Sequence, residues 1–140
     1  MTIIIDAGPL VTFTDLRDER YGAVRRIMLE EPGPLIVPAP VTAEADYLIG
    51  HRVGEHARRG FLDDLAEGRF QVDCLTPPDY TLITMLERQY ADLRPGLADL
   101  AVVASAARYR CTRILTFDER HFRVIRPLYG ETFTLLPADG

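Results

Sequence analysis

The chain has 140 residues, a length that suits one globular domain with a single hydrophobic core. Hydrophobic residues make up 47% of it and charged residues 26%, which is ordinary for a globular protein. No apolar run approaches the roughly 20 residues that a membrane helix needs. The net charge of −5 excludes a generally basic nucleic-acid-binding surface, so any contact with RNA must be local.

In chain order, the pattern predicts a strand (2–5), a helix that begins at Gly8-Pro9, a helix (19–31), a strand (35–37), two helices (41–50 and 54–68), a strand (70–75), two helices (77–93 and 97–109), a strand (113–117), a short turn or helix, and a last strand (132–136). The helices show apolar residues at helical spacing, and proline or glycine stands at most of their ends. The strands are mostly continuous apolar runs, which are typical of a parallel sheet buried on both faces. The sequence therefore predicts one α/β domain over residues 1–140, with a mostly parallel sheet between helices.

Two properties bear on the cellular compartment. The first residues have no basic region, and Asp6 interrupts their short apolar run, so we expect no signal peptide and a cytoplasmic protein. The two cysteines, Cys74 and Cys111, lie in or beside expected strands. We interpret both as buried thiols, because a disulfide is unusual in a cytoplasmic protein.

Four acidic residues occupy positions that this fold would bring together. Asp6 and Asp118 each follow an expected strand, whereas Glu44 and Asp99 lie near the starts of expected helices. In an open α/β sheet the ligand crevice lies at the carboxyl ends of the strands. Four carboxylates gathered there would repel one another unless a cation joined them. The arrangement predicts a divalent-metal site.

Each acid also has a simpler interpretation. Asp6 and Asp118 could be turn residues, Glu44 could be a solvated helix residue, and Asp99 could be favoured by the dipole of its helix. The joint arrangement is more specific than any single acid. Asp99 in particular stands in an otherwise apolar helix, where a carboxylate is costly unless it has a partner.

Short motifs around these acids resemble a known family. The matching segments are Ile3-Ile4-Ile5-Asp6, Val41-Thr42-Ala43-Glu44, Gly96-Leu97-Ala98-Asp99-Leu100-Ala101, Leu115-Thr116-Phe117-Asp118 and Asp118-Glu119-Arg120-His121-Phe122. In order and spacing they resemble the PIN-domain ribonucleases, most closely the VapC-type toxins of bacterial toxin–antitoxin pairs. The resemblance implies a PIN-like three-layer α/β/α fold. It also implies that Asp6, Glu44, Asp99 and Asp118 are the catalytic and metal-binding acids.

The same resemblance implies further properties. The protein would be an endoribonuclease that hydrolyses phosphodiester bonds of RNA. A small protein antitoxin would inhibit it, and it would form a homodimer. The sequence departs from the family pattern at Asp6-Ala7-Gly8-Pro9, where many relatives carry a Ser or Thr hydroxyl. Thr12 and Thr116 are the candidates to replace it.

The donor chemistry points to the same class of metal without the family. Carboxylate oxygens suit Mg²⁺, with Mn²⁺ as the alternative, better than Zn²⁺. The three histidines are scattered in sequence, so no Cys/His zinc motif competes. All 16 basic residues are arginine, which binds phosphate in a bidentate manner, although a GC-rich genome would also favour this usage.

Three basic residues near the acids are candidates for RNA contact. Arg94 precedes the helix of Asp99, and Arg120 and His121 follow Asp118; the simpler interpretation of each is a solvated loop residue. Asp15, Asp18 and Glu19 form a further acidic group, interpreted as a solvated turn. Two other functions remain open: an inactive PIN-like scaffold that binds RNA, and a different metal phosphohydrolase that acts on DNA flaps or nucleotides.

Overall fold

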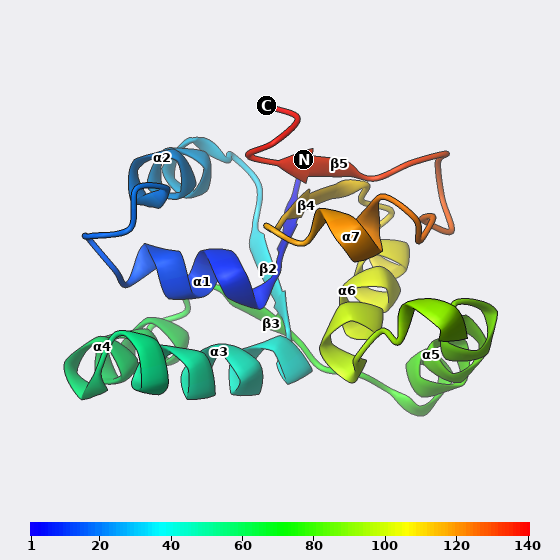
Figure 1. The fold of residues 1–140 in the computed structure, drawn as a ribbon, viewed down its shortest axis with the longest axis horizontal. Helices are drawn as coiled ribbons and strands as arrows, with labels where there is room; N and C mark the ends of the chain where they lie inside the picture. The colour runs from blue at the N-terminus through cyan, green and yellow to red at the C-terminus, as the bar shows by residue number, and fades with distance from the viewer.

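A computed structural model describes all residues from 1 to 140 and shows a parallel five-stranded sheet between helices (Figure 1). The strands are β1 (Ile3–Ile5), β2 (Leu35–Pro38), β3 (Gln71–Asp73), β4 (Arg113–Leu115) and β5 (Thr134–Leu136). Their order across the sheet is β3-β2-β1-β4-β5, and every neighbouring pair is parallel. The expected three-layer α/β/α fold is confirmed, and the sheet is wholly rather than mostly parallel.

Helices cover both faces of this sheet. They are α1 (Ala7–Phe13), α2 (Tyr21–Glu30), α3 (Ala39–Arg52), α4 (Glu55–Ala66), α5 (Pro77–Gln89), α6 (Leu97–Arg108) and α7 (Glu119–Phe122), with a short 3-10 helix at Ala91–Leu93. Figure 1 shows α1 to α4 on one side of the strands and α5 to α7 on the other. Right-handed crossovers account for this division, because the chain moves from β1 toward β3 and then returns past β1 to β4 and β5.

The core follows from the apolar runs of the sequence. Ile3, Ile4 and Ile5 are fully buried in the central strand, which explains why β1 shows no alternation of polar and apolar residues. Helix α6 is buried from Leu100 to Ala106, since it lies against both β1 and β2. Proline begins α5, and the Thr76–Asp79 capping box satisfies its first amide groups.

Several predicted boundaries were wrong by a few residues. Strand β3 is shorter than the expected 70–75, and β4 ends at Leu115, so Phe117 and Asp118 lie in the turn that follows. Helix α3 begins at Ala39, two residues before the expected start at 41, so Pro40 lies in its first turn, where its missing N–H costs no hydrogen bond. No helix combines the length and the hydropathy that crossing a membrane requires.

One prediction about the cysteines was also wrong. Cys111 is buried as expected, but Cys74 is exposed, and both are free thiols. Cys74 follows β3, which is an edge strand and therefore has a neighbouring strand on one side only. An edge position leaves residues at the strand end open to solvent, which an apolar run in the sequence does not reveal.

Candidate metal centre

The strand order places a ligand crevice between β1 and β4. The chain leaves β1 toward β2 on one side and reaches β4 on the other, so the connections diverge at this point. Such a switch point is where open α/β sheets bind their ligands, at the carboxyl ends of the strands. Asp6 directly follows β1, and Asp118 lies in the turn after β4. These two acids therefore stand at the mouth of the crevice.

The structure brings all four acids of the sequence analysis to one cavity. Asp6, Glu44, Asp99 and Asp118 line a space of about 420 Å³ at this edge of the sheet. Helix α3 supplies Glu44 from its second turn, and α6 supplies Asp99 from its first turn. Both helices begin at the carboxyl edge, so acids that are far apart in sequence meet there.

Asp6 is the most enclosed of the four, with 7% of its surface exposed. Its Oδ1 accepts a hydrogen bond from the amide of Ala7 at 2.9 Å, and its Oδ2 accepts one from the Thr116 hydroxyl at 2.7 Å. Burial raises the pKa of Asp6, and the charges of Asp99 and Asp118 add to this, while the two hydrogen bonds oppose it. Asp6 thus occupies a position where a cation would stabilise its charged form.

Thr116 supplies the hydroxyl that the family pattern places after the first aspartate. Besides donating to Asp6, its Oγ1 accepts a hydrogen bond from the amide of Asp118 at 2.9 Å, so one side chain links two acids. Thr12, the other candidate, instead donates to Asp18 at 2.9 Å. The departure at Ala7-Gly8 therefore leaves the first acid with a hydroxyl partner from a distant segment, the residue directly after β4.

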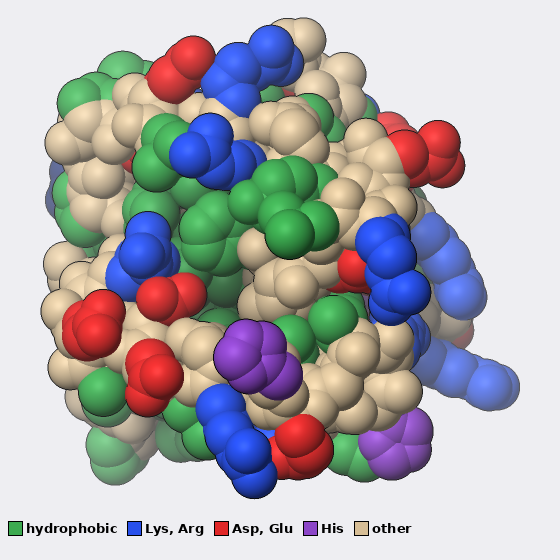
Figure 2. All heavy atoms as spheres, turned by 90° about the vertical axis from the view of Figure 1, so that its left-hand side faces the viewer, with side chains coloured by type: hydrophobic (Ala, Val, Ile, Leu, Met, Phe, Trp, Pro, Cys, Tyr) green, Lys and Arg blue, Asp and Glu red, His purple; other side chains and the backbone are tan.

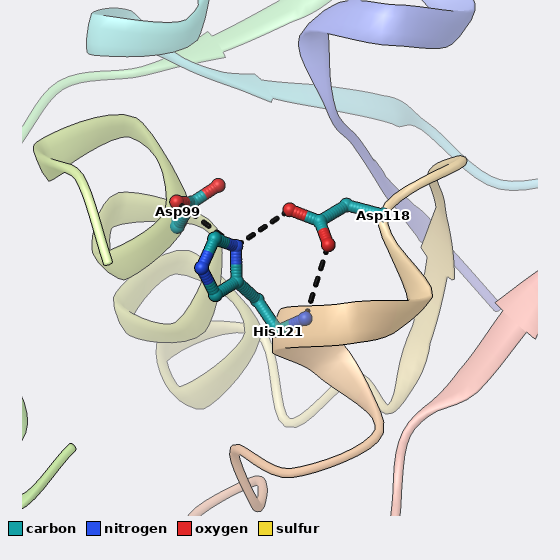
Figure 3. A group of neighbouring side chains, drawn as sticks. All are labelled: Asp99, Asp118 and His121. Atoms are coloured by element: carbon teal, nitrogen blue, oxygen red, sulfur yellow. Dashed lines mark hydrogen bonds and ion pairs between the residues drawn. The ribbon is translucent and has the colours of Figure 1, made fainter. Parts of the chain in front are cut away.

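Asp99 and Asp118 converge on His121, as Figure 3 shows. The Nδ1 atom of His121 lies 2.6 Å from Asp118 Oδ2 and 3.5 Å from Asp99 Oδ2. One potential ligand atom from each of these three residues lies within 4.8 Å of the others. The three histidines are scattered in sequence, but folding places this one among the acids, an arrangement that the sequence analysis did not foresee.

Both ring nitrogens of His121 are already engaged. Its Nε2 lies 3.0 Å from the carbonyl oxygen of Leu93, which can only accept, so this nitrogen carries a proton. Burial would lower the pKa of His121, but the hydrogen bonds with Asp118 and Leu93 and the charges of Asp118 and Asp99 outweigh it and raise this pKa. His121 therefore orients Asp118 and partly neutralises the acids.

Asp99 and Glu44 retain free carboxylate oxygens. Asp99 Oδ2 accepts a hydrogen bond from the Gly96 amide at 3.1 Å, whereas Glu44 has no hydrogen-bond partner in the chain. Burial raises the pKa of Asp99, with Asp118 adding to the shift and Gly96 and His121 opposing it. Partial desolvation, followed by the charges of Asp6 and Asp99, raises the pKa of Glu44. The positively charged groups near the four acids do not balance their negative charge.

Other residues of the cavity differ from the expected set. Asp15 and Asp18, expected in a solvated turn, line the same space, together with Arg20 and Arg52. Asp18 is held by Arg20, whose side-chain and backbone hydrogen bonds lower the pKa of Asp18 despite its partial desolvation. Arg94 and Arg120 are exposed and do not line the cavity. Arg52 went unnoticed, although its position eight residues after Glu44 on one helix places both on the same face.

Comparison with known proteins identifies the family of the chain. The model of the PIN domain family matches residues 3–127. The chain belongs to the PIN domain family. It is 36% identical to Ribonuclease VapC26 of Mycobacterium tuberculosis over 135 residues, which are 96% of this chain and all of that relative.

Solved structures share the PIN fold at low sequence identity. Mycobacterium tuberculosis VapC20, a Sarcin-Ricin loop cleaving toxin, has a TM-score of 0.76 and 16% identity, covering 83% of this chain and 89% of that one. VapBC2 of Rickettsia felis, bound to a DNA fragment from its promoter, has a TM-score of 0.70 and 14% identity, covering 96% of this chain and 98% of that one. FitAcB of Neisseria gonorrhoeae has a TM-score of 0.58 and 16% identity, covering 84% of this chain and 88% of that one.

Proposed function

We propose that this PIN-domain protein is a metal-dependent endoribonuclease and the toxin of a toxin–antitoxin pair. The observation that carries the proposal is the cavity at the switch point, where four carboxylates with little compensating charge face one another. The long match to a curated ribonuclease supports RNA as the substrate. The missing hydroxyl near Asp6 would have favoured an inactive scaffold, but Thr116 supplies one.

The side chains present suit a hard divalent cation. Asp6, Glu44, Asp99 and Asp118 offer carboxylate oxygens, and the nitrogens of His121 are engaged by Asp118 and Leu93. Oxygen donors of this kind favour Mg²⁺, or Mn²⁺, over Zn²⁺. When bound, the ion would polarise the scissile phosphate and lower the pKa of a water molecule, which could then lose a proton and attack the phosphorus atom as hydroxide.

The chain's own residues prepare the site for this reaction. Thr116 and the amide of Ala7 hold Asp6 in one orientation, and His121 holds Asp118. Holding the ligands reduces the reorganisation needed when substrate arrives. The Glu44 carboxylate, free of hydrogen bonds and nearer to solvent, remains available to the ion or to a water molecule.

The partner that we propose is a small protein antitoxin. Its tail would carry Arg or Lys into the cavity, because four carboxylates attract a cation, and would compete there with the metal. An apolar segment would supply most of the affinity, since one ion pair in a wet cleft contributes little. Figure 2 shows hydrophobic side chains gathered in a hollow on the face formed by α1, α2 and α4, which suits such a segment. We also propose that the protein forms a homodimer and acts in the cytoplasm, where its RNA substrate would be present.

A substrate panel tests the activity. The purified protein should cut single-stranded RNA with Mg²⁺ or Mn²⁺, should stop when the metal is chelated, and should leave DNA flaps and nucleotides intact. Cleavage of DNA or nucleotides instead would support a different phosphohydrolase. No cleavage of any substrate by metal-loaded protein would contradict the proposal.

A growth experiment tests the toxin role. Expression of the chain alone should arrest growth, and co-expression with the neighbouring gene should restore it. The Asp6→Asn variant should be harmless but still bind the partner through its apolar segment. Normal growth during confirmed expression of folded wild-type protein would contradict the toxin role, whether or not the protein cuts RNA in vitro.

A further inference from the structure

The acidic cavity also contains two arginines in different states. Arg20 is already bound within the chain. Its guanidinium donates to Asp18 through Nε at 3.1 Å and through Nη2 at 2.9 Å. The same group stacks on the Phe117 ring, with Cζ 3.9 Å from the ring centroid. Arg52 also lines the cavity but forms no hydrogen bond or ion pair within the chain. It is therefore the cation of this cavity that remains free to bind an external anion.

Helical geometry directs Arg52 toward the acids. Glu44, Leu48 and Arg52 follow one another at intervals of four residues along α3, so they form a row on the face that lines the cavity. Side chains on a helix lean toward its N-terminus, which tilts the long Arg52 side chain along this row in the direction of Glu44. Burial and the neighbouring acids raise the pKa of Glu44, and the positive charge of Arg52 opposes this rise, as expected for a cation nearby.

An exposed aromatic pair lies beside this row. The rings of Tyr47 and His51 stack with centroids 4.5 Å apart and an interplanar angle of 25°. Tyr47 is 61% exposed, and it follows Glu44 by three residues, so the two are neighbours on the helix surface. This exposure places Tyr47 outside the core. An exposed stacked ring beside a phosphate site is the feature with which proteins hold single-stranded bases.

The protein offers no general electrostatic attraction for RNA. On the face drawn in Figure 2, arginine side chains are interspersed with Asp and Glu and form no continuous basic stripe. The net charge of −5 has the same consequence. A substrate strand therefore depends on individual cations near the site, and Arg52 is the unpaired one in the cavity.

We propose that α3 holds the RNA strand beside the carboxylates, with Arg52 binding a backbone phosphate next to the scissile one and Tyr47, on the other side of Glu44, stacking a base. This inference rests on the proposed ribonuclease function and adds the element that positions the substrate. The occupant is a single strand, because a base inside a duplex could not reach an exposed ring. Arg52 and Tyr47 act by binding substrate and not by holding the metal.

The test compares Arg52→Ala with Arg59→Ala, which removes an exposed, unpaired arginine of α4 outside the cavity. Cleavage of a short single-stranded RNA is measured at several salt concentrations. Arg52→Ala should raise KM by at least tenfold with little change in kcat and no increase in the Mg²⁺ requirement. The slope of log KM against log salt should fall by about 0.7, the value for one phosphate contact with a single strand. Arg52→Lys should keep this slope, because it keeps the charge.

The stacking half of the proposal has its own variants. Tyr47→Ala should weaken RNA binding by roughly 5- to 150-fold, the range for one base–aromatic stack, without changing the salt slope. Tyr47→Phe should bind like the wild type, since the ring is kept. Binding is measured in the Asp99→Asn background, where the RNA should not be cut, and circular dichroism checks that each variant is folded.

The possible results separate this inference from the function on which it rests. If the wild type cuts RNA but Arg52→Ala behaves like Arg59→Ala in KM and salt slope, the phosphate contact is wrong although the ribonuclease function stands. If Tyr47→Ala binds as well as Tyr47→Phe, the stacking contact is wrong. If the wild type neither cuts nor binds RNA, both the proposed function and this inference are wrong.

Discussion

Two groups of carboxylates in this protein differ in how far positive charges of the chain compensate them. Asp73 and Asp79 lie between β3, α5 and α6, where Arg108 forms ion pairs with both. The Ser105 hydroxyl donates to Asp73 at 2.6 Å, and Thr76 donates to Asp79 at 2.7 Å through its amide. At the carboxyl edge, by contrast, Asp6, Glu44, Asp99 and Asp118 share one histidine and one unpaired arginine. Acids that stabilise the fold are fully paired with a cation of the chain, whereas the four acids of the proposed metal centre are only partly compensated.

The pKa values express the same difference. Burial would raise the pKa of Asp79, but hydrogen bonds from Thr76 and Arg108 outweigh it and lower this pKa. For Asp6 and Asp99, burial dominates and the pKa of each is raised. For Asp79 the hydrogen bonds decide the direction of the shift, and for Asp6 and Asp99 burial decides it. Removing charge from each group should therefore have opposite consequences for stability.

The largest effect is expected from an acid of the proposed metal centre. Asp99→Asn should reduce RNA cleavage by roughly three orders of magnitude, because the metal's contribution amounts to several kcal/mol. Without metal, the same variant should be as stable as the wild type or more stable, since it relieves repulsion among the acids. Single-turnover cleavage and denaturant unfolding in EDTA measure the two effects.

The matched control for this variant is Asp63→Asn, which removes an exposed carboxylate of α4 that has no partner. It should leave both cleavage and metal-free stability unchanged. Cleavage by Asp99→Asn at the level of Asp63→Asn would contradict the assignment of the metal centre. A clear loss of metal-free stability in Asp99→Asn would contradict the comparison between the two groups.

The opposite result is expected at the structural pair. Arg108→Ala leaves the nearly buried Asp73 carboxylate without its cation and should destabilise the protein by about 2 kcal/mol, less than for a fully buried pair because Arg108 is partly exposed. Urea unfolding at neutral pH measures this loss. Arg88→Ala, which removes an exposed and unpaired arginine of α5, should have almost no effect. Cleavage per folded molecule should remain normal in both, and equal stability of the two variants would refute the structural role.

Sequence reasoning could predict what local pattern determines. Continuous apolar runs indicated buried parallel strands, and acids at strand ends and helix starts indicated one site at the carboxyl edge, where all four acids do line one cavity. Contacts between distant segments were harder to foresee. Ser105 meets Asp73 across 32 residues and Thr116 meets Asp6 across 110, so neither pair leaves a local signal. The exposure of Cys74 depends on the strand order, which the apolar pattern does not specify.

Thr116 tests how much orientation matters inside the metal centre. Thr116→Val keeps the shape of the side chain but removes the hydroxyl that donates to Asp6 and accepts from the amide of Asp118. Cleavage should fall by roughly tenfold, as is usual when a group that orients a metal ligand is lost. Thr12→Val, which removes a buried hydroxyl bound to Asp18, is the control and should retain activity. If the two variants were equally active, the hydroxyl would have no part in holding Asp6.

The smallest effect concerns a carboxylate that is fully compensated at the surface. Asp139 accepts hydrogen bonds from Arg123 at 2.7 and 2.8 Å, and these, followed by the Leu135 amide, lower the pKa of Asp139 to about 2. Because the folded pKa lies below the ordinary value of 3.8, the stabilisation is complete above about pH 5 and is lost as the pH falls toward 2. The stability difference between wild type and Asp139→Asn should therefore be constant from pH 7 to pH 5 and should shrink between pH 4 and pH 3. Denaturant unfolding at each pH measures this difference, which should be small since the pair is exposed to solvent. A difference that instead grew on acidification would show that Asp139 resembles the raised carboxylates of the metal centre and not the compensated ones.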